Sequence, residues 1–175
     1  MNWILASGSP RRRELLEMLG VPNLTIRPAK GPERATPGAG PEQTCAPEDI
    51  VIAADTIVYL DGVILGKPKD TADAARMLAA LSGREHTVYT GVAVLRGGET
   101  RLAAEHTAVR FRTLTPAEIA RYIATGEPMD KAGAYGIQGR GALFVAHLDG
   151  DYFNVMGLPL CRLGQLLNEL GVELL

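Results

Sequence analysis

The sequence predicts a single α/β domain with a mixed β-sheet flanked by helices. Its 175 residues are the size of one domain. Short apolar segments of strand type alternate with segments in which apolar residues recur at helical spacing. Neither an internal repeat nor a flexible linker interrupts this alternation. We therefore assign residues 1–175 to one α/β unit.

The apolar pattern and the capping residues place the elements. Ser9 and Pro10 favour a helix start, Thr71 is expected to cap the second helix, and Asp61-Gly62 predicts a tight turn. Residues 28–47 are rich in proline and glycine and predict a loop. The predicted strands are residues 2–5, 24–26, 49–54, 56–60, 63–65, 86–95, 101–112, 143–148 and 152–155, the last two forming a hairpin. The predicted helices are residues 10–19, 72–81, 116–125 and 159–170.

Composition and charge exclude several classes of protein. An apolar fraction of 46% with 22% charged residues is typical of a globular chain. No apolar run approaches the roughly 18 residues of a membrane span, and residues 1–5 lack the features of a signal peptide. We expect a cytoplasmic protein that binds no membrane. The net charge of −2 disfavours binding along nucleic-acid backbones, so any anion site must be local.

The cysteines and histidines do not predict a metal site of their own. Cys45 and Cys161 are far apart in sequence, so we expect two unpaired thiols. The three histidines also lack the spacing of metal ligands. A zinc centre is therefore not expected.

Residues 6–13, Ala-Ser-Gly-Ser-Pro-Arg-Arg-Arg, form a candidate phosphate-binding motif between the first strand and the first helix. A helix start presents unpaired N–H groups and a partial positive charge, and so binds anions. Ser7 offers a hydroxyl, and Arg11 and Arg12 offer forked donors that suit phosphate oxygens. The alternative is a capped helix with its arginines in solvent. Three arginines at the positive end of a helix dipole favour a bound anion.

Two carboxylates are candidates for metal binding or proton transfer. Asp55 follows an apolar strand, and ligands of open α/β sheets sit at strand ends. Such a carboxylate can hold Mg²⁺ or accept a proton from water. Its alternative is an ordinary turn aspartate. Glu33, in the proline-rich loop, is a candidate metal ligand if that loop folds over the site.

Two further segments carry polar groups suited to a nucleotide. Pro68 restricts Lys67 to an extended conformation, which projects a cation suited to polyphosphate; a solvated turn lysine is the alternative. Residues 127–139 alternate small residues with charged and amide groups. Within them, Gln138 both donates and accepts and so can bind the edge of a uracil- or thymine-type base. The alternative is a compact loop between a helix and a hairpin.

Taken together, these motifs resemble the Maf family of nucleotide pyrophosphatases. The matching segments occur in the family's order and cover nearly the whole chain. They are residues 5–12, 53–58, 66–68, 81–86, 90–94, 127–139 and 155–159. The resemblance implies an elongated Maf/ITPase-like α/β fold, with a mixed sheet flanked by helices and a central cleft between two lobes. It also implies a homodimer.

The resemblance further implies an activity and a set of roles. Family members hydrolyse nucleoside triphosphates between the α- and β-phosphates with a divalent metal, here Mg²⁺ or Mn²⁺. By position, Asp55 is similar to the catalytic carboxylate and metal ligand, and Glu33 to an acidic metal helper. Residues 130–138 resemble the subgroup acting on dTTP and UTP, so modified pyrimidine nucleotides and a house-cleaning role are also expected. The residues implied to bind phosphate are Ser7, Arg11, Arg12 and Lys67, and those implied to set base preference are Thr56 and Gln138 with Arg11.

In one segment the chain departs from the family pattern. Members usually carry a helix with an Ala-x-x-Lys-Ala pattern before the Asp55 strand, whereas residues 34–49 contain no lysine and three prolines. Lys30 or Arg34 could replace that charge, although neither is at the matching place. The departure leaves open a catalytically weakened nucleotide-binding regulator linked to septum formation, with which the family has been associated. The other alternative function is nucleic-acid binding, and the acidic pI disfavours it.

Overall fold

The computed structural model describes residues 1–28 and 45–175 and divides into two compact units. Unit 1 comprises Met1–Asp55, Gly91–Ala104 and Gly157–Leu175, and unit 2 comprises Thr56–Thr90 and Glu105–Met156. The described strands form a seven-stranded mixed sheet in the order β2-β1-β3-β5-β6-β7, with β4 paired to β3. The predicted α/β class with a mixed sheet and flanking helices is confirmed.

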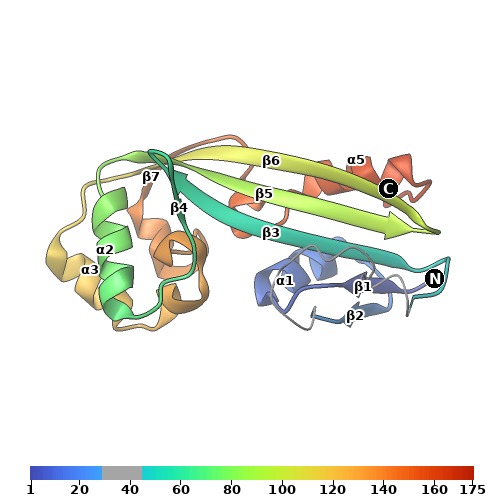
Figure 1. The fold of residues 1–175 in the computed structure, drawn as a ribbon, viewed down its shortest axis with the longest axis horizontal. Helices are drawn as coiled ribbons and strands as arrows, with labels where there is room; N and C mark the ends of the chain where they lie inside the picture. The colour runs from blue at the N-terminus through green and yellow to red at the C-terminus, as the bar shows by residue number, and fades with distance from the viewer. Residues whose placement is uncertain (29–44) are drawn as a thin grey trace. The chain divides into compact units, whose positions relative to one another are not determined.

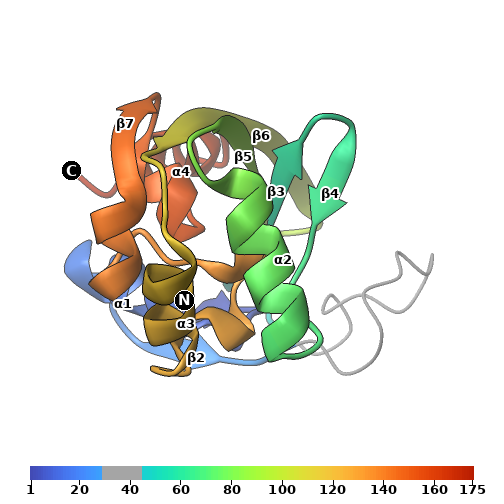
Figure 2. The ribbon, with the colours of Figure 1, turned by 90° about the vertical axis from the view of Figure 1, so that its left-hand side faces the viewer.

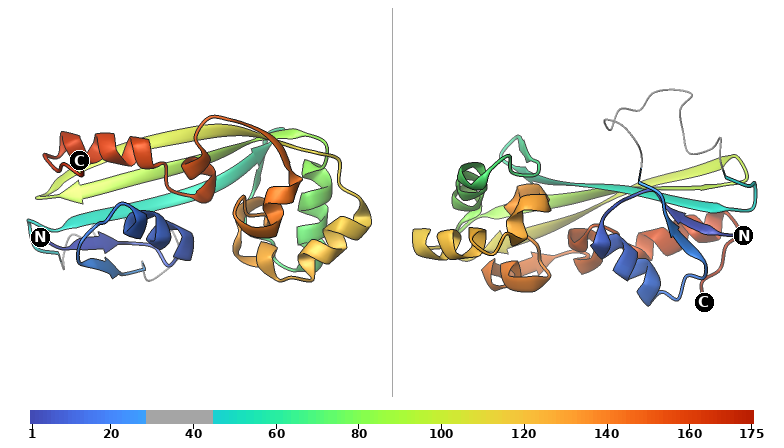
Figure 3. Two further views of the ribbon diagram at one scale, coloured as in Figure 1. Left: turned by 180° about the vertical axis from the view of Figure 1, so that it is seen from behind. Right: turned by 90° about the horizontal axis from the view of Figure 1, so that it is seen from below.

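Unit 1 is built on a short parallel arrangement. Strand β1 pairs with β2 on one side and with the start of β3 on the other, both in parallel, as Figure 1 shows. The apolar faces of α1 and α5 are buried, and both helices lie on the same side of these strands (Figure 3, right). The elements that lie in unit 1 or cross its boundary are β1 (Trp3–Leu5), α1 (Pro10–Met18), β2 (Leu24–Ile26), β3 (Ile50–Leu60), β5 (Glu85–Arg96), β6 (Glu99–Phe111) and α5 (Leu160–Glu169).

Unit 2 packs helices against the other parts of β3, β5 and β6. Helices α2 and α3 lie side by side (Figure 2). The β3–β4 hairpin turns at Asp61 and Gly62, which both have positive φ, as a tight hairpin turn requires. Its further elements are β4 (Val63–Leu65), α2 (Thr71–Leu81), α3 (Pro116–Ile123), η2 (Glu127–Asp130), η3 (Ala132–Ala134), η4 (Gly139–Phe144), β7 (Val145–Asp149) and α4 (Tyr152–Met156).

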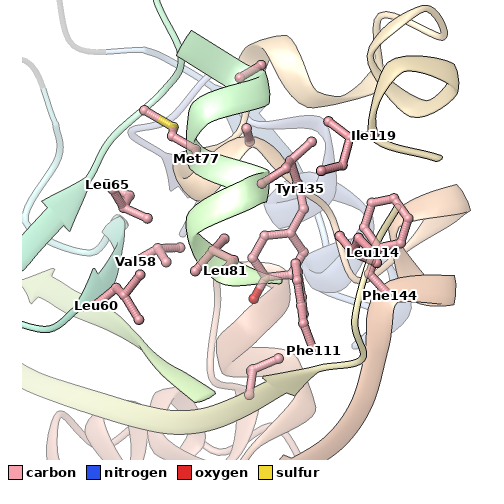
Figure 4. Close-up of a cluster of buried hydrophobic side chains, with 14 of the residues drawn as sticks. Val58, Leu60, Leu65, Met77, Leu81, Phe111, Leu114, Ile119, Tyr135 and Phe144 are labelled. Atoms are coloured by element: carbon pink, nitrogen blue, oxygen red, sulfur yellow. The ribbon is translucent and has the colours of Figure 1, made fainter. Parts of the chain in front are cut away.

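The core of unit 2 explains why these elements stay together. Met77 and Leu81 on one face of α2 pack into a buried cluster with Phe111 of β6 and Tyr135 of the loop after η3 (Figure 4). The ring centroids of Phe111 and Tyr135 are 4.7 Å apart in an edge-to-face arrangement. Burial of such large apolar side chains is the main favourable term in folding. The cluster thereby supports the segment that contains Gln138.

Three sequence predictions of local structure were wrong in detail. Residues 152–155 form helix α4 and not the second arm of a hairpin, because the Asp151 side chain accepts a hydrogen bond from Phe153 N (2.8 Å) and Asn154 is buried. Asp70 caps α2 in place of Thr71, since its Oδ1 accepts from Asp73 N (2.8 Å). The third, the strand end at Asp55, is described with the site.

Two other expectations concern the thiols and the membrane. Cys45 and Cys161 are both free thiols, as predicted. Over residues 1–28 and 45–175, no helix has the length and apolar character needed to cross a bilayer.

Candidate active site

The start of helix α1 follows directly from the end of β1. Ala6 N donates to Ile52 O (2.8 Å), after which the chain leaves the sheet. Ser9 is the N-cap and Pro10 the first helical residue, as the sequence predicted. Within the described chain, the Ser9 side chain makes no capping bond and the first turn contains no acidic residue. The partial positive charge of this helix start is therefore not balanced by a carboxylate of its own first turn.

Ser7 and Arg12 form a tethered pair at this helix start. Arg12 Nη1 donates to Ser7 Oγ (3.0 Å), and Arg12 Nε donates to Gly157 O (2.7 Å). Ser9 N also donates to Ser7 Oγ (3.2 Å). Both bonds to Ser7 use its lone pairs, so neither uses the hydroxyl proton, which suits Ser7 for donation to an anion.

The three consecutive arginines occupy different environments. Arg13 is exposed and donates to Glu17 Oε1 (2.7 Å), a bond that raises the pKa of Arg13. It therefore follows the alternative of an ordinary solvated arginine. Arg11 and Arg12 are half-buried. Of the three arginines, Arg11 and Arg12 are thus the ones whose partial burial suits a ligand of an anion.

Asp55 lies inside strand β3, which corrects the predicted strand end. Strand β3 runs without a break from Ile50 to Leu60. Its parallel pairing with β1 stops where Leu5 lies opposite Ile52. Along an extended strand, Asp55 is about 10 Å beyond that pair. Ser7 also follows Leu5, so both residues lie past the same edge of the paired strands of unit 1, and the Asp55 side chain is exposed.

In unit 2 the structure describes the other three predicted residues. Lys67 is exposed, next to the buried Pro68. The preceding Gly66 O accepts from Gly133 N (3.1 Å), which ties this turn to η3. Gln138 is half-buried at the start of η4. Thr56 is half-buried, and its Oγ1 lies 2.9 Å from Thr90 Oγ1.

Glu127 organises the segment around Gln138, a role that the sequence analysis missed. Its carboxylate accepts from Tyr122 Oη (2.9 Å), Arg140 N (3.1 Å) and Gly141 N (3.2 Å). Burial raises the pKa of Glu127, but these bonds outweigh it and hold the pKa below its usual value. A Cβ on Gly139 would lie 3.0 Å from the Glu127 carboxylate oxygens. Residues 127–139 thus fold as a compact series of short 3₁₀ turns, and Gln138 directly precedes the last of them, η4.

A buried His86–Tyr135 pair attaches residues 127–139 to strand β5. His86 Nε2 lies 2.7 Å from Tyr135 Oη, and His86 is 3% exposed. Burial lowers the pKa of His86 to about 4 and raises the pKa of Tyr135. Both groups are therefore neutral near pH 7. Their position in the core assigns them to structure and not to chemistry at a surface site.

The acidic residues of the described chain form no complete metal centre. Among residues 1–28 and 45–175, no three His, Cys, Asp or Glu side chains gather. Glu33, Lys30 and Arg34 lie outside the described residues. Mg²⁺ is often held by one or two carboxylates together with substrate phosphates. The exposed Asp55 carboxylate fits that mode of binding, which needs few ligands from the protein.

Comparison with known proteins decides the family. Residues 2–170 match the family model described as Maf-like protein. The chain belongs to the Maf family. The resemblance found in the sequence motifs is thus confirmed, while the roles of the individual site residues remain predictions.

Curated relatives of this Maf protein carry a name that states an activity. A protein of Moorella thermoacetica is 53% identical over 97% of this chain and 95% of its own length. One of Symbiobacterium thermophilum is 49% identical over 96% and 93%, and one of Bacillus pumilus is 48% identical over 97% and 96%. Each of these relatives is named dTTP/UTP pyrophosphatase.

The buried His86 predicts acid sensitivity of the fold. Its pKa is about 4 when folded and 6.5 when exposed, so the unfolded chain binds an extra proton between these values. The free energy of unfolding should fall by on the order of 3 kcal/mol as the pH drops from 6.5 through 4, and the loss from this group levels off below its folded pKa. Urea unfolding of the wild type and of His86→Gln between pH 4 and 7 measures this. The variant should lose less stability over this window, and equal losses would contradict the assignment.

Proposed function

We propose that this Maf protein hydrolyses dTTP and UTP to the monophosphate and pyrophosphate. The observation that carries the proposal is the identity of 46–53% to relatives named for this activity, with at least 93% of this chain aligned. The tethered Ser7–Arg12 pair lies at a helix start whose N-cap, Ser9, makes no side-chain capping bond within the described residues, and this arrangement suits a phosphate group.

The phosphate groups of the substrate are assigned to the basic groups. Ser7 and the start of α1 donate hydrogen bonds to phosphate oxygens, and Arg11 and Arg12 supply forked cationic donors. Arg12 is held by Gly157 O and Ser7 Oγ, so little side-chain freedom remains to be lost on binding. Lys67 is assigned to the outer phosphates as a point charge.

Asp55 is assigned to the reacting centre, with Glu33 as the second acidic group. A divalent cation, Mg²⁺ or Mn²⁺, held by these carboxylates and the substrate would neutralise charge on the phosphate oxygens. Water attacks the α-phosphorus, the bond from the α-phosphorus to the bridging oxygen breaks, and pyrophosphate leaves. Asp55 either accepts the proton of that water or positions it by binding the cation.

The base is assigned to Thr56 and Gln138, together with Arg11. Uracil and thymine present one N–H between two carbonyl groups, and an amide that both donates and accepts can bind such an edge. Modified pyrimidine nucleotides with the same edge are substrates under this assignment. We further propose that the protein is cytoplasmic and forms a homodimer.

A panel of nucleoside triphosphates tests the proposed activity. UTP, dTTP, CTP, ATP and GTP are incubated with the protein, with and without Mg²⁺ or Mn²⁺, and the products are separated. UMP and dTMP with equimolar pyrophosphate are expected, and only when metal is present. Nucleotide binding without hydrolysis would instead favour the weakened regulator suggested by the missing lysine in residues 34–49.

Replacement of Asp55 tests its assigned role. Asp55→Asn removes the charge but keeps the size, so kcat for UTP should fall by about 100-fold or more while the thermal midpoint is nearly unchanged. Asp61→Asn is the matched control, because Asp61 is an exposed turn residue of the β3–β4 hairpin that pairs with Arg84. Near-normal turnover in Asp55→Asn would overturn the assignment.

A further inference from the structure

Thr90 lies within a buried chain of hydrogen bonds in unit 2. It belongs to β5 and is 0% exposed. Its Oγ1 is 3.0 Å from the backbone O of Asn154 and 2.9 Å from Thr56 Oγ1. A carbonyl oxygen can only accept, so Thr90 donates its single hydroxyl proton to Asn154.

This assignment fixes the direction of the bond between the two threonines. Because the Thr90 proton is used on Asn154, Thr90 Oγ1 can only accept from Thr56. The hydroxyl proton of Thr56 is therefore directed to Thr90. In any further bond, Thr56 Oγ1 must therefore use a lone pair and act as the acceptor. Such an oxygen repels phosphate oxygens and suits an N–H group.

The carbonyl at the end of the chain is held in place. Asn154 is 0% exposed, and its Nδ2 donates to Val88 O (3.0 Å) and to Thr107 Oγ1 (2.9 Å). Thr107 Oγ1 in turn donates to Asp151 O (3.0 Å). Helix α4 is thus attached to β5 and β6, and the acceptor for Thr90 stays in position.

We propose that Thr90 is a positioning residue for base selection, which holds Thr56 Oγ1 as the acceptor for N3–H of uracil or thymine. This inference rests on the proposed dTTP/UTP hydrolysis. In a nucleotide, N3–H is the one N–H group on the ring of these two bases, whereas cytosine has a lone pair at N3. An acceptor opposite N3 therefore attracts uracil and thymine and repels cytosine.

The Thr90→Val variant tests the inference through a ratio of substrates. Valine keeps the shape but removes the acceptor, so the Thr56 proton becomes available to the N3 lone pair of cytosine. The ratio of kcat/KM for UTP to that for CTP should fall by about tenfold. Thr90→Ser retains the hydroxyl and should preserve the ratio.

Thr107→Val is the matched control for a purely structural effect. Thr107 is equally buried and belongs to the same network, but its bonds join Asn154 and Asp151 and do not reach Thr56. We expect lower stability with an unchanged UTP-to-CTP ratio, because the bond from Asn154 Nδ2 to Val88 O still holds Asn154 beside Thr90. If Thr90→Val fails to fold, Thr90→Ala removes the same acceptor without adding a methyl group, and the same fall in the ratio is expected.

The outcomes separate this inference from the proposed function. A wild-type protein that hydrolyses neither UTP nor dTTP would refute the function itself. With an active wild type, an unchanged ratio in Thr90→Val would overturn the inference alone. A uniform loss for UTP and CTP would also overturn it, since Thr56 would then contact a part common to both nucleotides.

Discussion

In unit 1, the parallel register of β1 on β3 sets the positions of the groups assigned to phosphate binding and hydrolysis. The buried strand residues Trp3–Leu5 lie opposite Ile50–Ile52, and a polar clamp precedes them. The buried Asp49 Oδ1 accepts from Asn2 N and Asn2 Nδ2, both at 2.9 Å, and this bonding lowers the pKa of Asp49. A shift of one residue would leave that carboxylate without its partners and turn each β3 side chain to the opposite face.

Two hydroxyl groups, that of Ser7 in unit 1 and that of Thr56 in unit 2, have opposite hydrogen-bonding character. In unit 1, Ser7 Oγ accepts from Arg12 and Ser9, so its proton is directed to an incoming acceptor such as a phosphate oxygen. In unit 2, Thr56 gives its proton to Thr90, so its oxygen receives a donor such as a base N–H group. Under the proposed assignments, the direction of the hydroxyl proton is what suits Ser7 to a phosphate group and Thr56 to a base.

Short sequence patterns correctly predicted those helix starts and turns that depend only on residues adjacent in the sequence. Ser9-Pro10 placed the start of α1, and Asp61-Gly62 placed the hairpin turn. Asp55 was misplaced at a strand end because β3, which is hydrogen-bonded to its neighbour β5, continues through residues of low strand propensity. The roles of Glu127 and Thr90 depend on bonds to residues distant in sequence or to backbone atoms, which no local pattern shows.

Binding of inorganic pyrophosphate in the presence of Mg²⁺ tests most directly whether the Ser7–Arg12 helix start holds the phosphates. Calorimetric titration compares the wild type with Ser7→Ala, which removes the hydroxyl donor and the acceptor that holds Arg12. Loss of a hydrogen bond to a charged group should weaken binding by about tenfold or more, whereas Thr56→Val should bind pyrophosphate like the wild type. Unchanged affinity in Ser7→Ala, or an equal loss in Thr56→Val, would contradict the account.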